Sequence, residues 1–137
     1  TLVGEVAATM VLRFRRDGNV EYAEMRRCCL EFARLVPAEG QIVVDGGFSR
    51  DEYGKAVAHN ASMAFAWMDR KGFNYPVEDL SNQTLDAIAA RGGRYWIAAP
   101  DDRVPGLDTA RYRRLAQCGD VEYALYDLRP DLPPEAP

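Results

Sequence analysis

The residues best placed for chemistry are two short polar segments, each of which directly follows a predicted buried strand. Asp45, Gly46 and Gly47 follow the first of these strands, and Asp101 and Asp102 follow the second. In an open α/β sheet, ligands bind beyond the carboxyl ends of the strands. We therefore expect the two segments to lie near each other and to form a ligand-binding site, although the pattern does not specify a reaction.

The segment at the first strand lacks the motifs of known phosphate chemistry. Around Asp45 the sequence is Val-Val-Asp-Gly-Gly, which has neither the GxGxxG spacing of a dinucleotide turn nor the lysine of a Walker loop. It also lacks a second carboxylate two residues after Asp45, which an aspartate-based phosphoryl-transfer site of the haloacid-dehalogenase type requires. A tight turn at the end of a strand explains the two glycines, and we favour that interpretation.

No catalytic residue is predicted elsewhere in the chain. His59 is the only histidine, and no GxSxG nucleophile motif accompanies it, so we interpret it as a loop residue before a helix cap. The acidic pairs are sequence neighbours in turns or first helical turns, where negative charge favours the helix dipole. These pairs are Asp51-Glu52, Glu78-Asp79 and Asp101-Asp102.

Two cations, Arg70 and Lys71, end a predicted helix. Positive charge at this position complements the negative end of the helix dipole and also offers a contact for an anion. We favour structural capping and keep an anion contact as the alternative.

Composition excludes several classes of function. The chain has 137 residues, a formal net charge of −4 and 47% hydrophobic residues, which is typical of a folded domain and not of a nucleic-acid-binding protein. The three cysteines form an odd set without metal-ligand spacing, so the sequence indicates neither a disulfide framework nor a zinc site. We expect no metal and no cofactor.

The basic cluster Arg13, Arg15 and Arg16 is interpreted as a solvated edge, with contact to an anionic lipid surface as the alternative.

Hydrophobic spacing and capping signals predict alternating helices and strands. The clearest helix begins after Ser81, with Leu80 and Leu85 placed for a hydrophobic staple. A second predicted helix ends at Gly72, which suits a left-handed cap. The predicted helices are residues 19–36, 60–71, 81–91 and about 108–117, and the predicted strands are residues 41–45, 95–99 and 121–128.

Strands separated by helices favour right-handed crossovers and a parallel sheet covered on both faces. We therefore predict an α/β fold, a three-layer Rossmann-like sandwich with a mainly parallel sheet. Residues 1–128 are predicted to form one domain, followed by a proline-rich tail over residues 129–137. Residues 1–18 are expected to be either an antiparallel edge strand, from Val6 to Arg15, or a membrane-proximal linker. No apolar run reaches the length that a transmembrane helix needs.

One longer pattern indicates a family. The helix end Trp67–Phe73, then Pro76 and a capped helix, then Ala90–Ile97, resembles the soluble C-terminal region of polytopic bacterial glycosyltransferases. These are relatives of dolichyl-phosphate-mannose protein mannosyltransferases and of lipid-A aminoarabinose transferases. The similarity includes the helix end at Leu35–Pro37 and the strand Ile42–Asp45, and covers most of residues 22–128.

The resemblance implies a small α/β domain on the extracytoplasmic, periplasmic side, attached to a membrane-embedded catalytic region that uses polyprenyl-phosphate sugars. Family catalytic acids lie in loops of the membrane region, so none is transferred to a position in this chain. Our first hypothesis is a noncatalytic accessory domain whose partner is the catalytic region of the same polypeptide. The alternative is a cytoplasmic Rossmann-like domain that binds a nucleotide or another phosphorylated small molecule, and a third is a protein-interaction module.

Overall fold

The structure is a computed structural model that describes residues 22–58, 60–100, 102, 104–119 and 123–137. Residues 22–33 form a helix. The elements that follow are β1 (Ile42–Asp45), α2 (Ser62–Met68), β2 (Gly72–Tyr75), η1 (Val77–Asp79), α3 (Asn82–Ala90), β3 (Tyr95–Ala98), η2 (Thr109–Arg111), β4 (Arg113–Cys118) and β5 (Tyr123–Asp127). The α/β class predicted from the sequence is confirmed.

The strands form one five-stranded open sheet in the order β2-β1-β3-β5-β4. Strand β1 is central to a parallel half, because it pairs in parallel with both β2 and β3. Strand β5 pairs antiparallel with β3 on one side and with β4 on the other. The sheet is therefore mixed, whereas the sequence predicted a mainly parallel one.

The antiparallel half arises where the sequence analysis was wrong. We predicted a helix from about Asp108 to Gln117, but Asp108 caps only the single turn η2, and Arg113–Cys118 is strand β4. The residues Arg-Arg-Leu-Ala-Gln favour a helix by intrinsic propensity. Main-chain pairing with β5 outweighs that preference, because a strand's stability depends on its neighbours more than on its own residues.

Strand β2 was not predicted, and the role assigned to Gly72 is wrong. Asp69 takes the left-handed conformation that ends α2, with φ of 51°, and Gly72 begins β2 opposite Ile42. A Cβ atom at position 72 would lie 1.8 Å from the carbonyl oxygen of Ile42. Glycine is therefore required here by the close approach of two strands and not by the end of a helix.

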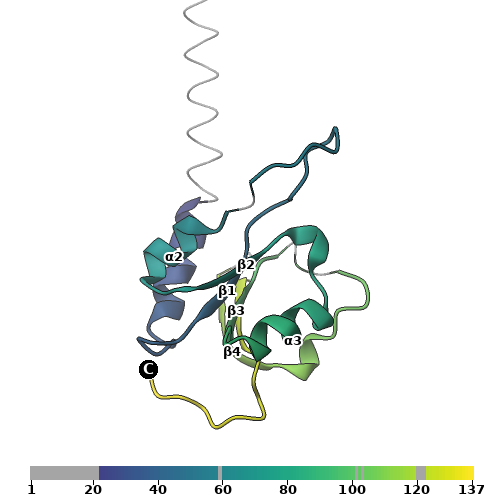
Figure 1. Ribbon diagram of the computed structural model, residues 1–137. Helices are drawn as coiled ribbons and strands as arrows, with labels where there is room; N and C mark the ends of the chain where they lie inside the picture. The colour runs from purple at the N-terminus through teal and green to yellow at the C-terminus, as the bar shows by residue number, and fades with distance from the viewer. Residues whose placement is uncertain (1–21, 59, 101, 103, 120–122) are drawn as a thin grey trace, which may run out of the picture.

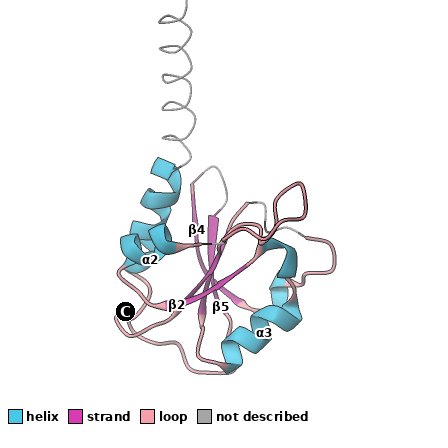
Figure 2. Ribbon diagram, turned by 45° about the horizontal axis from the view of Figure 1, so that its top comes forward, coloured by secondary structure: helices cyan, strands magenta, loops and turns pink. Residues whose placement is uncertain are grey.

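Helices cover both faces of the sheet (Figures 1 and 2). The helix at residues 22–33 and α2 pack on one face, where Phe32 and Met68 meet Ile42 in one core cluster. Helix α3 packs on the other face, where Leu85 and Trp96 belong to a second cluster. The cap and staple predicted for α3 are confirmed, since Ser81 Oγ accepts a hydrogen bond from the amide of Thr84 at 3.0 Å and both staple leucines are buried.

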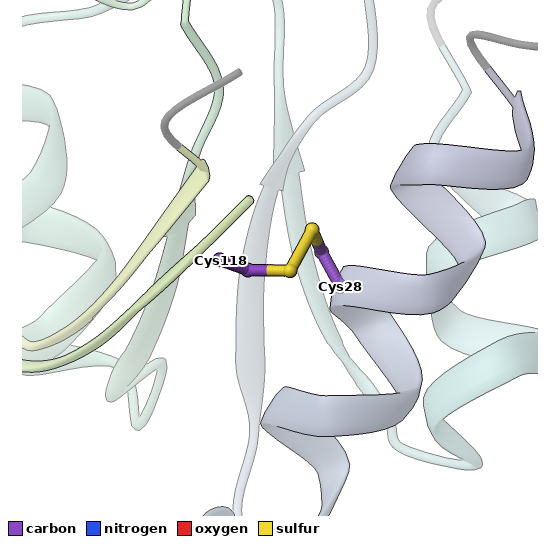
Figure 3. The surroundings of a disulfide bond; sticks show 2 residues. All are labelled: Cys28 and Cys118. Carbon is purple, nitrogen blue, oxygen red and sulfur yellow. A yellow bond between two sulfur atoms is a disulfide. The ribbon is translucent and has the colours of Figure 1, made fainter. Parts of the chain in front are cut away.

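A disulfide joins the first helix to the sheet, contrary to our interpretation of the cysteines. Cys28 on the helix is bonded to Cys118 at the end of β4, and both residues are 2% exposed (Figure 3). Cys29 is a buried free thiol. The two bonded residues are 90 positions apart. The prediction failed because it was based on the odd number of cysteines, and an odd number is compatible with one disulfide and one free thiol.

The C-terminal segment lies against the start of β3. The guanidinium of Arg94 makes two hydrogen bonds to the buried carboxylate of Asp127, at 2.9 and 3.0 Å, and one to the carbonyl oxygen of Pro133 at 2.8 Å. Glu135 accepts a hydrogen bond from the hydroxyl of Tyr95 at 2.6 Å and is paired with Arg94 at 3.2 Å. These contacts hold the proline-rich tail beside the sheet.

Two sequence-based expectations fall on residues that the structure does not describe. The edge strand expected from Val6 to Arg15 lies outside the described residues, as does His59. Within the described ranges, no helix combines the length and the apolar character needed to cross a bilayer.

Candidate ligand-binding site

A cavity of about 430 Å³ opens where β1 and β3 end, at the place predicted from the sequence. We call it the strand-end cavity. The ends of both strands contribute to its wall, as do the first turn of the helix at residues 22–33 and the start of α2. Three of the predicted site residues line it, Asp45, Gly46 and Gly47, together with Pro100 after β3.

The exit of β1 is held in a defined turn. The carboxylate of Asp45 accepts a hydrogen bond from the amide of Gly47 at 2.5 Å, and Gly47 has φ of 89°, which explains a glycine at that position. The amide of Gly46 donates to the carbonyl oxygen of Tyr75, and that of Val77 donates to the carbonyl oxygen of Gly47, both at 3.0 Å. The turn is thereby fixed to the end of the neighbouring strand β2.

Asn60 lines the cavity beside the exit of β1. Its main-chain amide donates to the carbonyl oxygen of Gly46 at 2.7 Å, and its side-chain oxygen accepts a hydrogen bond from the amide of Ser62 at 2.8 Å. The second contact closes a local turn that fixes the side chain just before α2, whose N-cap residue is Ala61. The side-chain nitrogen of Asn60, Nδ2, carries two N–H groups that are hydrogen-bond donors.

The charged residues among the described lining of the cavity are acidic. Glu24 and Asp45 both contribute to its lining, and the described lining residues include no lysine or arginine. The remaining side chains are mostly apolar or aromatic, with Tyr22 and Met63 at 53% and 42% exposure.

The structure separates Asp102 from the other predicted site residues. Its carboxylate accepts hydrogen bonds from the amide of Ala99 at 2.8 Å and from the hydroxyl of Tyr75 at 3.1 Å, and that hydroxyl in turn accepts one from Trp96 Nε1 at 3.0 Å. Burial, and next the charge of Asp102, raise the pKa of Tyr75. Asp102 lines a second cavity, of about 540 Å³, beside Trp96 and Tyr126. Asp101 lies outside the described residues.

Arg70 and Lys71 lie far from the strand ends, beside the start of β1, where the carbonyl oxygen of Lys71 accepts a hydrogen bond from the amide of Ile42. The Arg70 guanidinium donates to five main-chain carbonyl oxygens at 2.8–3.2 Å. These belong to the ends of the two helices that share one face of the sheet: Ala33, Val36, Pro37, Met68 and Asp69. Its donors therefore serve the structural capping favoured from the sequence.

The sequence analysis missed four polar or aromatic members of the strand-end cavity: Tyr22, Glu24, Asn60 and Tyr123. Asn60 carried only a partial signal, since asparagine is a preferred helix cap but the N-cap of α2 is Ala61. The other three carried none, because their place depends on how the first helix and β5 pack. The described residues contain no group of three or more His, Cys, Asp or Glu side chains placed to hold a metal ion.

Comparison with known proteins gives no relative: no family model matches the chain, and no curated protein or solved structure shows significant similarity to it.

Proposed function

We propose that this chain is a noncatalytic accessory domain of a membrane-embedded glycosyltransferase that uses lipid-linked sugar donors, and that it lies on the extracytoplasmic face of the membrane. Two observations support the proposal. The first is the sequence resemblance described above, and the second is the disulfide between Cys28 and Cys118.

The disulfide is the observation that carries the proposed location. Disulfides form and persist in oxidising compartments and are rare in the cytosol of mesophiles. The bond between Cys28 and Cys118 is buried at both ends and joins a helix to an edge strand of the sheet, which is a structural position. Burial raises the pKa of the neighbouring Cys29 thiol to about 11, so Cys29 is a poor nucleophile for exchange with that bond.

A projecting arm that exposes apolar side chains supports the proposed partner, the membrane-embedded catalytic region of the same polypeptide. Residues 48–57 project from the sheet between β1 and α2 (Figure 1) and expose Phe48, Tyr53 and Val57 at 64%, 79% and 42%. The arm is ordered by its own hydrogen bonds, including Val57 N to Ser49 O and Asp51 N to Lys55 O, each at 2.9 Å. The arm also exposes four charged residues, Arg50, Asp51, Glu52 and Lys55, so it offers a mixed surface on which aromatic side chains supply the apolar contacts.

We also infer that the fold is a three-layer Rossmann-like sandwich extended by an antiparallel pair. The order β2-β1-β3, with α2 between β1 and β2 and α3 between β2 and β3, is the arrangement that supports this inference.

The location is tested by thiol trapping in cells that make the full-length polypeptide. Proteins are precipitated with acid, denatured and treated with a polyethylene-glycol maleimide, with and without prior reduction. A variant with Cys28→Ala and Cys118→Ala is the matched control. Without reduction, the two proteins should carry the same number of adducts. Two additional adducts on the wild-type protein would show that both thiols are reduced in the cell and would refute an extracytoplasmic location.

The role is tested by sugar-transfer assays. The isolated chain should give no turnover with a polyprenyl-phosphate sugar, and turnover by the isolated chain would refute a noncatalytic role. In the full-length enzyme, the double variant Phe48→Ser and Tyr53→Ser should lower transfer severalfold while its insertion and amount stay unchanged. Leu35→Ser, at a position 41% exposed on the other end of the domain, is the control. Equal activity of the arm variant and the control would refute docking through the arm.

The alternative function is binding of a nucleotide or another phosphorylated small molecule in the cytoplasm, and the described residues that line the strand-end cavity include no lysine or arginine to support it. A ligand present at one hundred times its dissociation constant stabilises a protein by about 2.7 kcal/mol. Thermal unfolding in the presence of nucleotides or sugar phosphates should therefore show no such stabilisation. A shift with any of them would favour the alternative.

A further inference from the structure

The cavity of about 540 Å³ that Asp102 lines is on the α3 face of the sheet, over strands β3, β5 and β4. We call it the sheet-face cavity. Two residues of the loop between β3 and η2, Val104 and Leu107, add apolar side chains to its wall. Its volume lies within the range of small-molecule sites.

The register of the strands explains why this part of the sheet is hollow. Alternate residues of a strand face the same side, so side chains on one face form rows across the strands. One row of the cavity carries three large side chains, which are Trp96, Tyr126 and Arg114. The next row carries the paired residues Ala98 and Ala124, with Gln117 beside them on β4. The floor of the cavity is therefore low over the two alanines and rises at the aromatic rings.

Tyr126 is the aromatic ring of the floor that a ligand meets. It stacks on Trp96 with ring centroids 5.1 Å apart and an interplanar angle of 28°. Trp96 is fully buried, and Tyr112 packs against it edge-on at 6.2 Å, whereas Tyr126 is partly exposed. Because the stack holds Tyr126 in place before a ligand arrives, ordering this ring adds little to the entropic cost of binding.

Polar side chains from two elements border the same floor. Arg114 and Gln117 belong to β4, and Thr109 belongs to η2. They offer a guanidinium, an amide and a hydroxyl, so together they donate and accept hydrogen bonds. Arg114 Nη1 and Gln117 Oε1 are 3.4 Å apart, which places a donor and an acceptor within reach of neighbouring atoms of one ligand.

The charged residues of the lining have opposite signs. Arg114 is exposed at the cavity, and the carboxylate of Asp102 is buried in its wall. A charged ligand is attracted by one of these groups and repelled by the other. The lining therefore favours a ligand without net charge.

We infer that the sheet-face cavity binds a neutral sugar ring. A pyranose carries C–H groups on its faces and hydroxyl groups around its edge, which matches a floor of methyl and aromatic groups bordered by hydrogen-bonding side chains. The ring lies over Ala98 and Ala124 and packs against Tyr126. Its hydroxyl oxygens accept hydrogen bonds from Arg114, and a hydroxyl group donates to Gln117. The inference does not depend on the proposed membrane location, because binding is measured on the isolated chain.

An amide-resolved NMR titration with the methyl pyranosides of glucose, galactose and mannose tests the inference. The signals of Ala98, Gln117 and Ala124 report on the sheet-face cavity, and those of Gly46 and Gly47 at the strand-end cavity are the internal reference. At least one glycoside should shift the first set in a saturable way and leave the second unchanged. No saturable shift with any of the three glycosides would overturn the inference.

Two further probes test which groups of the ligand are recognised. Cyclohexanol has a ring of the same size and one hydroxyl group, so it should bind at least tenfold more weakly than the best glycoside. Glucose 6-phosphate carries a negative charge and should also bind more weakly. Equal affinity for cyclohexanol would show that the hydroxyl groups are not recognised, and tighter binding of the phosphate would show that the ligand is anionic. Either result would overturn the inference.

Matched variants locate the interaction. Ala124→Leu fills the low part of the floor and should weaken binding of the best glycoside at least tenfold. Gln117→Ala removes an exposed amide at the cavity and should weaken it severalfold. Gln83→Ala removes the same group at an exposed position on α3 outside the described lining and should have no effect. Dispersed NMR spectra establish that a variant is folded. Unchanged affinity in Gln117→Ala or in folded Ala124→Leu, or an equal loss in Gln83→Ala, would overturn the inference.

Discussion

Reduction of the disulfide is the perturbation whose effect follows most directly from the structure. Cys28 and Cys118 are 90 residues apart in the sequence, so their bond closes most of the described chain into one loop. In the chain-entropy model, a cross-link with this separation destabilises the unfolded state by about 4.6 kcal/mol at room temperature. Unfolding free energies of whole domains are roughly 5–15 kcal/mol, so this one bond is a large fraction of the total.

The expected change in melting temperature follows from the size of the chain. An unfolding entropy of about 2.1 cal/mol/K per residue gives about 3.5 °C per kcal/mol for a domain of this length. The reduced protein should therefore melt about 16 °C below the oxidised one. Both sulfur-bearing residues are 2% exposed, so reduction of the folded protein should be slow and should become fast only in denaturant.

The assay compares oxidised and reduced protein by urea unfolding, followed by far-ultraviolet circular dichroism, with free thiols counted in each sample. Reduced wild-type protein keeps both sulfur atoms in place, so the comparison isolates the covalent link from the packing of the side chains. Cys29→Ala is the matched control, because it removes the only other described thiol without touching the bond. Identical urea midpoints for fully oxidised and fully reduced protein would refute the reasoning.

Three further predictions concern single residues. Gly72→Ala places a Cβ against the main chain of Ile42 and should lower the free energy of unfolding by about 3 kcal/mol or more, measured by urea denaturation; a cost below about 1 kcal/mol would contradict the close strand approach. Arg70→Ala removes the donors that cap two helices and should lower the free energy of unfolding by about 2–3 kcal/mol. The control Lys71→Ala should lower it by less than about 0.5 kcal/mol. Equal losses of stability in the two variants would argue against the capping role. Burial raises the pKa of Cys29 from 9.0 to about 11, so between these pH values the folded protein binds one proton more than the unfolded protein. The free energy of unfolding should therefore fall as the pH rises from 9.0 to about 11. Rapid alkylation of Cys29 in the folded protein at neutral pH would contradict its burial.

Local signals in the sequence were sufficient for several elements. Strands β1 and β3 follow from short runs of buried, largely β-branched or aromatic residues, and α3 follows from its serine cap and leucine staple. These elements agree at every level, since propensity, spacing and capping favour the same structure. The place of the strand-end cavity was predictable for the same reason, because it depends only on where parallel strands end.

Elements that depend on distant partners were not predictable. Strand β4 has residues that favour a helix, and it is a strand because β5 pairs with it. Strand β2 has only four residues, three of them exposed or partly exposed, so its hydrophobic pattern carries little information. The disulfide depends in turn on β4, because Cys118 reaches Cys28 only from the end of that strand.

The separation of Asp45 from Asp102 has a physical cause that limits what strand-end arguments can predict. Parallel strands end at the same edge of a sheet, but a side chain beyond that edge can turn toward either face. The amide of Gly47 holds Asp45 at the strand-end cavity. The hydroxyl of Tyr75 and the amide of Ala99 hold Asp102 beside Trp96, which belongs to the core cluster of the α3 face. The two residues line different cavities, yet the charges of both raise the pKa of the Tyr75 hydroxyl, so both carboxylates lie close enough to that buried group to act on it.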